Sequence, residues 1–109
     1  MPAGLLLLNI TVGVFGLFRP AELVVRPEPG SVLLLDGTAM RNPMHIKAAK
    51  LEAHQRLTFT GRDGGPAPFL LSVPGKIERR FQGTLAITKS GGALIPVVTL
   101  DLETAAAAA

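Results

Sequence analysis

The sequence of 109 residues contains no cysteine, no tryptophan and no tyrosine. Without cysteine the chain can form no disulfide, no thiolate metal site and no thiol nucleophile. The redox compartment in which the protein works therefore cannot be read from the sequence. Aromatic residues make up only 5% of the chain, and all of them are phenylalanine.

Charged residues are also few, at 17% of the chain, whereas hydrophobic residues make up 48%. This composition is typical of a globular protein and argues against a disordered chain. A chain of this length has room for one modest hydrophobic core. We therefore expect residues 1–109 to form a single domain, and a two-domain enzyme is excluded.

The net charge is +3, but the basic residues are scattered along the chain. Only Lys76, Arg79 and Arg80 stand close together. Nucleic-acid-binding domains of this size combine a basic stripe with stacking aromatic residues, so we expect no nucleic-acid partner. His45 and His54 lie nine residues apart with no carboxylate at a ligand-like spacing, which predicts no metal site. Phosphate-binding and nucleophile motifs are missing as well, so no cofactor is expected.

Residues 2–18 carry no charge, yet they do not read as a membrane span. A spanning helix needs about 20 apolar residues, and this stretch is shorter and is interrupted by Asn9 and by glycine. From there Ile10, Val12 and Val14 alternate with smaller residues, as in a strand. We predict a strand that follows a hydrophobic leader. A degenerate signal or anchor is the alternative, although the positive residues of a secretory signal are missing.

Short apolar runs separated by turn residues predict a mainly β fold, a small β-rich domain of antiparallel hairpins. Pro29-Gly30 is expected to join two strands as one hairpin, and Asp36-Gly37 to end the second of these strands. Ser90–Gly92 is expected to close another hairpin over residues 80–99. The predicted strands lie near residues 9–15, 22–27, 31–36, 56–60, 68–73, 81–88 and 93–99.

Residues 43–55 do not fit this pattern of short strands and turns. Asn42 stands where a helix N-cap would be, and Pro43 suits the first position of a helix. The apolar residues that follow form no helical stripe, however. We favour a strand near residues 46–53, and a helix is the alternative. Later in the chain, Pro96 has no N–H group to donate, which predicts an edge position or a bulge in the last strand.

The chain ends in a run of alanine, which is the best helix former. A carboxylate ahead of this run can cap the first N–H groups of a helix, so we expect a short C-terminal helix that begins near Asp101. Glu103 would lie in its first turn, where a structural role explains it. Gly83, within the stretch "FQGTL", would weaken a strand for no gain. We therefore predict that it lies where a side chain does not fit or where the strand bends.

An ordered series of motifs fills the C-terminal third of the chain. Phe81 is followed by Gly83–Leu85, a strand "AITK", a turn "SGG", a second strand "ALIPVV" and the pair Leu102-Glu103. In this order the motifs resemble the family of sporulation stage II protein D and the amidase enhancer LytB. The upstream stretches "ITVGVF" and "LLSVPGKIERRF" are similar to the opening strand of that family and to the lead into its core motif. The resemblance covers most of the chain and is strongest over residues 73–104.

The resemblance implies a bacterial protein of the cell wall, either a lytic transglycosylase of peptidoglycan or an enhancer of wall amidases. Its implied partners are peptidoglycan glycan strands or a cell-wall amidase, and its implied location is the cell envelope, in the periplasm or at the outer cell surface. In such a transglycosylase one carboxyl group protonates the glycosidic oxygen. The same group then acts as base on the 6-hydroxyl of the sugar, which gives an anhydro product.

The family carries this catalytic glutamate further along the helix that its "L-E" pair opens, where the present sequence reads Ala105–Ala109. The resemblance therefore implies the N-terminal portion of such a domain, truncated before the glutamate, inactive alone and without a catalytic residue. Whether the chain belongs to an enzyme stays open, and no substrate-binding residue is assigned. The alternative is a self-contained β-rich binding or interaction module with no enzymatic activity.

Overall fold

The computed structural model describes residues 9–101, which form nine strands and three short 3-10 turns. The fold is mainly β, as predicted, and every strand pair is antiparallel. The strands are β1 (Asn9–Gly13), β2 (Glu22–Pro27), β3 (Leu33–Leu35), β4 (Thr38–Met40), β5 (Met44–Lys47), β6 (Leu57–Thr60), β7 (Ala67–Val73), β8 (Ile77–Ser90) and β9 (Ala93–Asp101). The 3-10 turns are η2 (Gly16–Phe18), η3 (Ala48–Lys50) and η4 (Arg62–Gly64).

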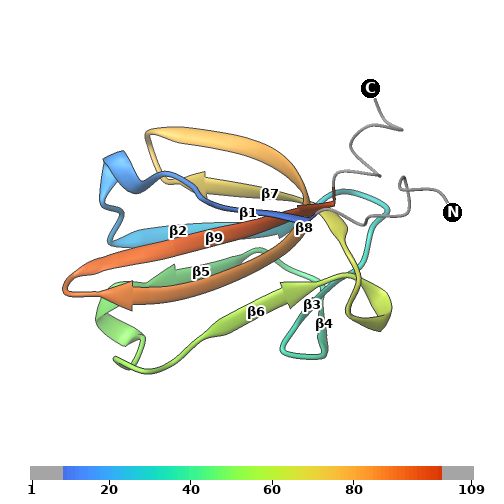
Figure 1. Cartoon of the computed structure of the whole chain (residues 1–109), viewed down its shortest axis with the longest axis horizontal. Helices are drawn as coiled ribbons and strands as arrows, with labels where there is room; N and C mark the ends of the chain where they lie inside the picture. The colour runs from blue at the N-terminus through green and yellow to red at the C-terminus, as the bar shows by residue number, and fades with distance from the viewer. Residues whose placement is uncertain (1–8, 102–109) are drawn as a thin grey trace, which may run out of the picture.

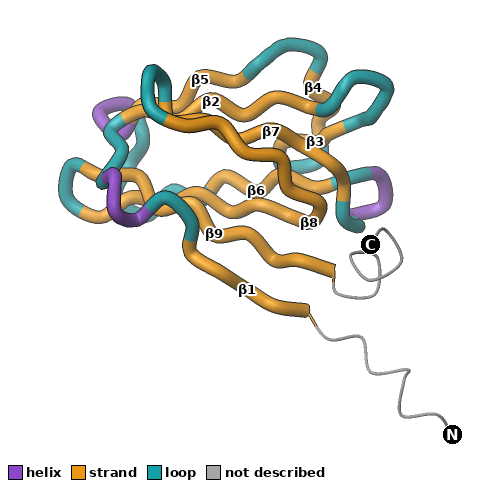
Figure 2. Tube along the Cα trace, turned by 90° about the horizontal axis from the view of Figure 1, so that it is seen from above, coloured by secondary structure: helices purple, strands orange, loops and turns teal. Residues whose placement is uncertain are grey.

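The strands lie in two layers that share β8, and together they form a nearly closed barrel (Figures 1 and 2). One layer has the strand order β5-β2-β7-β8, and the other has the order β4-β3-β6-β8-β9-β1. The long strand β8 has 14 residues. Its first half pairs with β7, and its second half pairs with β6 and β9. One strand therefore holds the two layers together.

Gly83 is the residue at which β8 passes from one layer to the other. It faces Ala67 of β7 and Leu100 of β9, so it has a strand neighbour on both sides. A Cβ atom at this position would overlap the carbonyl oxygen of Thr99 and lie 3.0 Å from its carbonyl carbon. The prediction that no side chain fits at Gly83 is confirmed. The residue lets β9 approach β8 closely where the sheet turns.

The hydrophobic core lies between the two layers. Successive side chains of a strand point to opposite faces, and β7 shows this directly, since every second residue from Ala67 to Val73 is buried. Phe59 and Phe69 are fully buried and are the largest side chains of the core. No polar or charged residue in the described part of the chain is buried. The core therefore provides packing and no ready site for chemistry.

The hairpin predicted over residues 80–99 is confirmed. The second half of β8, from Gly83 to Ser90, pairs with β9, and the last pair, between Ser90 and Ala93, leaves a loop of two glycines. Pro96 of β9 accepts a hydrogen bond from the Val14 N–H at 3.1 Å, just past the last pair between β1 and β9, which joins Gly13 to Val97. The N–H and C=O of one residue face the same neighbour in an antiparallel strand. The nitrogen of Pro96 therefore points to the place where β1 ends.

The hairpin predicted around Pro29-Gly30 is wrong. The chain does turn there, with a φ of 85° at Gly30 and a hydrogen bond from the Ser31 N–H to the Glu28 carbonyl. However, β2 has β5 and β7 as its neighbours, whereas β3 pairs with β4 and β6 in the other layer. The turn signal is local, but the edges of β2 are occupied by strands from later in the chain. The turn therefore carries the chain from one layer to the other.

Asp36-Gly37 ends β3, as predicted, and also starts a strand that the sequence did not reveal. The two residues have φ of 48° and 89°, and they join Leu35 directly to its partner Thr38. Two central residues with positive φ make the tight hairpin loop that suits the twist of paired strands. The Asp36 carboxylate also accepts a hydrogen bond from the Thr58 N–H at 3.1 Å. This contact attaches the hairpin to β6.

The strand predicted over residues 46–53 is wrong in its extent. Strand β5 ends at Lys47, and η3 follows it at once. The Ala48 N–H donates to the Ala21 carbonyl at 2.8 Å, and the Leu51 N–H donates back to the Ala48 carbonyl at 3.2 Å. The first bond continues the pairing of β5 with the segment before β2, and the second closes the turn of η3 that ends the strand. The segment is therefore neither a continuous strand nor an α-helix.

Asp101, where a helix was expected to begin, is instead the last residue of β9 and faces Asn9 of β1. The placement of the helix start is therefore wrong, because pairing with β1 keeps this part of the chain extended. Residues 102–109, which include Glu103 and the rest of the predicted helix, lie outside the described residues, as does the apolar leader before Asn9. Within residues 9–101 no helix has the length and apolar character needed to cross a membrane.

Candidate functional site

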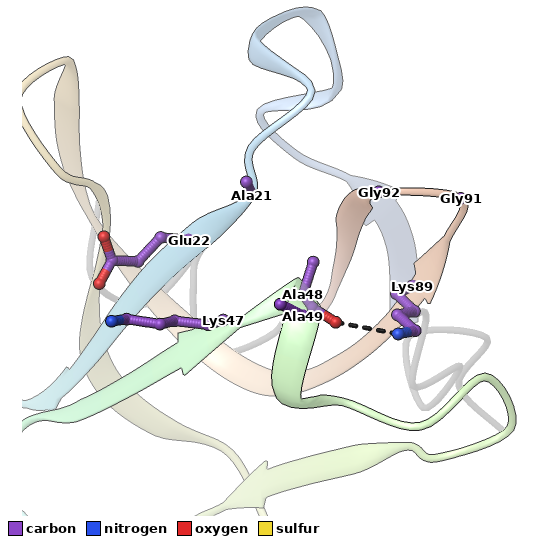
Figure 3. Close-up of a pocket in the computed structure, with 8 residues that line it drawn as sticks. All are labelled: Ala21, Glu22, Lys47, Ala48, Ala49, Lys89, Gly91 and Gly92. Carbon is purple, nitrogen blue, oxygen red and sulfur yellow. Dashed lines mark hydrogen bonds between the residues drawn. The ribbon is translucent and has the colours of Figure 1, made fainter.

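A cleft of about 420 Å³ opens at one end of the molecule, where the start of β2, the end of β5 and the turn between β8 and β9 meet (Figure 3). Its walls come from three separate parts of the chain. The cleft is hollow because alanine and glycine supply most of its lining and leave the space unfilled. The lining residues are Ala21, Glu22, Lys47, Ala48, Ala49, Lys89, Gly91 and Gly92.

Lys89 is the charged group that is fixed in this cleft. Its Nζ atom donates a hydrogen bond to the Ala48 carbonyl oxygen at 2.9 Å, which joins the end of β8 to η3 (Figure 3). Lys89 is half-buried. An ammonium group has three donors, so two remain for a ligand. In the part of the chain that the structure describes, no carboxylate forms an ion pair with Lys89.

Glu22 and Lys47 are paired across β2 and β5, and their side chains extend side by side away from Lys89 (Figure 3). The Glu22 carboxylate also lies 3.9 Å from Nδ1 of His45. Its negative charge is therefore directed toward Lys47 and His45. The end of the cleft next to Lys89 keeps a positive character.

The cleft presents the free donors of Lys89 and apolar walls to any small group that enters it. The cleft combines methyl groups of alanine with one fixed ammonium group. This combination suits a ligand in which a carboxylate lies next to a small apolar group. Residues 11–100 include no buried carboxyl group that could serve as a general acid of raised pKa. The same residues hold no group of three His, Asp or Glu side chains placed to bind a metal ion.

The basic residues near position 80 do not form one cluster. Arg80 lies on the outer face of the sheet and pairs with Glu28, with Nη2 and Oε2 at 3.1 Å. Arg79 points to the other face, because neighbours in a strand alternate, and it donates to the carbonyl of Glu78. Lys76 lies in the turn between β7 and β8. The hydrogen bond from Arg80 lowers the pKa of Glu28.

The two histidines are not brought together. His45 lies on β5 near Glu22, and His54 lies exposed in the loop after η3. Sequence reasoning missed Lys89 and the cleft, because residues 21–22, 47–49 and 89–92 are far apart in the chain. The small residues of "KAA" and "SGG" were the only local signals, and these are also common in turns.

Comparison of the chain with models of known families, with characterised proteins and with solved structures found no significant match. The family resemblance therefore rests on the ordered motifs of the sequence.

Proposed function

We propose that this chain is the β scaffold of a bacterial cell-wall remodelling protein of the sporulation stage II protein D and LytB type. In this proposal it binds peptidoglycan in the cell envelope and supplies no catalytic group of its own. A cell-wall amidase is the other partner that the resemblance offers. The lytic transglycosylase activity of the family would need a general-acid carboxyl group, and residues 11–100 contain no buried one.

The observation that carries the proposal is the position of Gly83. The resemblance singles out the motif Gly83–Leu85 between an aromatic residue and a strand. The glycine of this motif lies where β8 joins the two layers, and a side chain there would overlap the backbone of β9. A motif residue that is incidental would not be expected at such a position. The support is structural, since Gly83 shapes the scaffold and contacts no ligand.

The cleft around Lys89 gives the scaffold a way to bind the wall. Peptidoglycan carries free carboxylates on short peptides that are rich in small side chains. One ammonium group with free donors and a lining of alanine methyl groups match such a ligand. A charge-assisted hydrogen bond is stronger than a neutral one. Binding through a single exposed cation is nevertheless weak and is screened by salt.

Sedimentation with purified peptidoglycan tests this function. We expect the chain to sediment with the insoluble polymer at low ionic strength and to be released as salt is added. Lys89→Gln removes the fixed ammonium group and should lower the bound fraction several-fold. Lys50→Gln, which removes the same charge from η3 outside the cleft, is the matched control and should bind like the wild type. Equal binding by the two variants would reject the cleft as the binding site.

The second candidate function is a self-contained binding module that never depended on a catalytic group. The cleft favours it, because its walls and its cation come entirely from residues 21–92. Such a module would bind a short carboxylate-bearing peptide in solution. Calorimetric titration with the dipeptide Ala-Ala measures this directly. Binding to the peptide and not to peptidoglycan would favour the module over the wall protein.

A further inference from the structure

A short loop between β1 and β2 holds two apolar side chains in solvent. Leu17 is 100% exposed, and the neighbouring Phe18 is 38% exposed, both within η2. We refer to this pair as the apolar tip. Scattered exposed apolar residues are common on proteins, but here two adjacent ones lie in the same short turn. The tip lies at the same end of the molecule as the turn between β7 and β8 (Figure 1).

The backbone keeps the apolar tip in this exposed position. Phe15 and Arg19, on either side of η2, have φ of 59° and 44°. Residues other than glycine seldom adopt this region, and they stay there only where the surroundings fix them. Two hydrogen bonds close the turn, from the Phe18 N–H to the Phe15 carbonyl at 3.0 Å and from the Arg19 N–H to the Gly16 carbonyl at 3.2 Å.

Aromatic contacts anchor the base of the loop. The Phe15 ring lies edge-on to the Phe81 ring of β8 and to the Phe18 ring, with centroids 6.1 Å and 6.2 Å apart. The Phe81 ring in turn packs against the ring of the buried Phe69, with centroids 5.8 Å apart. The tip therefore rests on a chain of rings that leads into the core. Leu17 takes part in no such aromatic contact, and the ring contacts of Phe15 and Phe18 fix the backbone on which it stands.

Positive charges flank the apolar tip. Arg19 follows it directly, and Lys76 borders the same cavity of about 220 Å³ as Phe18 and Arg19. Glu22 also borders this cavity, but its carboxylate is paired with β5, near His45. Neither Arg19 nor Lys76 forms an ion pair within the described residues. The apolar tip is therefore an exposed apolar pair with two basic side chains beside it, neither of which forms an ion pair in the described part of the chain.

We propose that this surface docks on an anionic lipid membrane, with Leu17 and Phe18 inserted at the level of the headgroups. Binding at a membrane surface becomes stronger with the apolar area that is buried and with the attraction of basic residues to anionic lipids. Arg19 and Lys76 are placed to meet lipid phosphates. A soluble acidic polymer would use the two cations and leave Leu17 in water. The exposed leucine therefore favours lipid. The cavity beside the apolar tip adjoins the cleft around Lys89 and shares Ala21 and Glu22 with it, but Phe18, Arg19 and Lys76 do not line that cleft.

The absence of tryptophan and tyrosine from the chain permits a direct test. Leu17→Trp places a single indole at the apolar tip of the full 109-residue chain. Arg62→Trp places the same reporter in η4, at the opposite end of the molecule. Vesicles of phosphatidylcholine with phosphatidylglycerol should shift the emission of Leu17→Trp to the blue. The emission of Arg62→Trp should not change, and vesicles of phosphatidylcholine alone should give a smaller shift for Leu17→Trp.

Vesicle sedimentation then separates the contributions of charge and apolar area. Lys76→Glu should lower the partition coefficient about tenfold, because each basic residue near an anionic surface adds a measurable attraction. Leu17→Ser should lower it about fivefold or more. Arg62→Glu, the matched charge control, should have less effect than Lys76→Glu. The apolar residues before Asn9 are the same in all variants and cannot account for these differences.

Four outcomes would overturn the proposal. These are an unchanged emission of Leu17→Trp with anionic vesicles, an equal shift in Arg62→Trp, an equal shift with phosphatidylcholine alone, and equal losses of binding in Lys76→Glu and Arg62→Glu. Circular dichroism of each variant establishes that it is folded. Because Leu17 is fully exposed, its substitutions should leave the fold intact.

Discussion

A Cβ atom on Gly83 would overlap the carbonyl oxygen of Thr99, in the neighbouring strand β9. We therefore predict that Gly83→Val lowers the free energy of unfolding by more than ~1 kcal/mol. Urea denaturation measures this change. Gly92→Ala is the matched control, because nothing lies within 4 Å of the Cβ position there. A neutral Gly83→Val would show that the motif glycine is incidental.

The tight loop between β3 and β4 gives a second prediction. Gly37 has a φ of 89°, and nothing lies within 4 Å of its Cβ position, so substitution there has only a conformational cost. Gly37→Ala should therefore lower the free energy of unfolding by about 1 kcal/mol. Gly13→Ala, in equally open surroundings but without a positive φ, should have a smaller effect. Equal effects of the two in thermal unfolding would contradict the assigned turn.

The ion pair between Glu28 and Arg80 predicts a pH dependence. The hydrogen bond from Arg80 lowers the pKa of Glu28 below its ordinary value of 4.5. A carboxyl whose pKa is lower in the folded state stabilises the fold above its unfolded pKa, and this stabilisation is lost as pH falls through the folded pKa. As the pH falls below about 4.5, the Glu28→Gln variant should therefore lose less stability than the wild type does.

Glu52→Gln is the control for this measurement, because Glu52 takes part in no ion pair of the described residues. Glu52→Gln should lose stability at acid pH as the wild type does. The salt pair is exposed, so the difference between the two variants should shrink as salt is added. A pH profile of Glu28→Gln identical to that of Glu52→Gln would mean that the pair is not formed in solution.

Lys89 should contribute modestly to stability as well as to binding. Lys89→Gln loses the hydrogen bond to the Ala48 carbonyl, and a typical bond of this kind contributes about 1 kcal/mol. The variant should therefore unfold at a slightly lower urea concentration and still be folded in the binding assay. A loss of several kcal/mol would show that the lysine holds η3 in place, and the binding assay would then need Lys89→Arg, which keeps the charge.

Local patterns predicted most of the strands, because alternation and turn residues act within a few positions. Residues 22–27 form β2 as predicted, and the hairpin of β8 and β9 has its loop at Gly91 and Gly92. Gly83 could also be placed in advance, since a glycine inside a strand has few explanations. These features depend on neighbours in the sequence.

The predictions that were wrong or missing concern features that depend on residues distant in the sequence. Pro29-Gly30 turns the chain, but the partners of β2 come from β5 and β7. Asp101 carries a good capping side chain, yet pairing with β1 keeps it extended. The cleft around Lys89 could not be predicted at all, because its walls meet only once the two layers have formed. The exposure of Leu17 likewise depends on the unusual backbone of Phe15 and Arg19.

The most direct test of the proposed function is product analysis after incubation with purified peptidoglycan. General acid catalysis contributes about 10² to 10⁴ in rate, and residues 11–100 offer no buried carboxyl group for it. We predict that the chain sediments with the polymer and that mass spectrometry of the supernatant finds no anhydro-sugar product above a blank without protein. Anhydro-sugar product that exceeds this blank and disappears in Glu103→Gln would contradict the account.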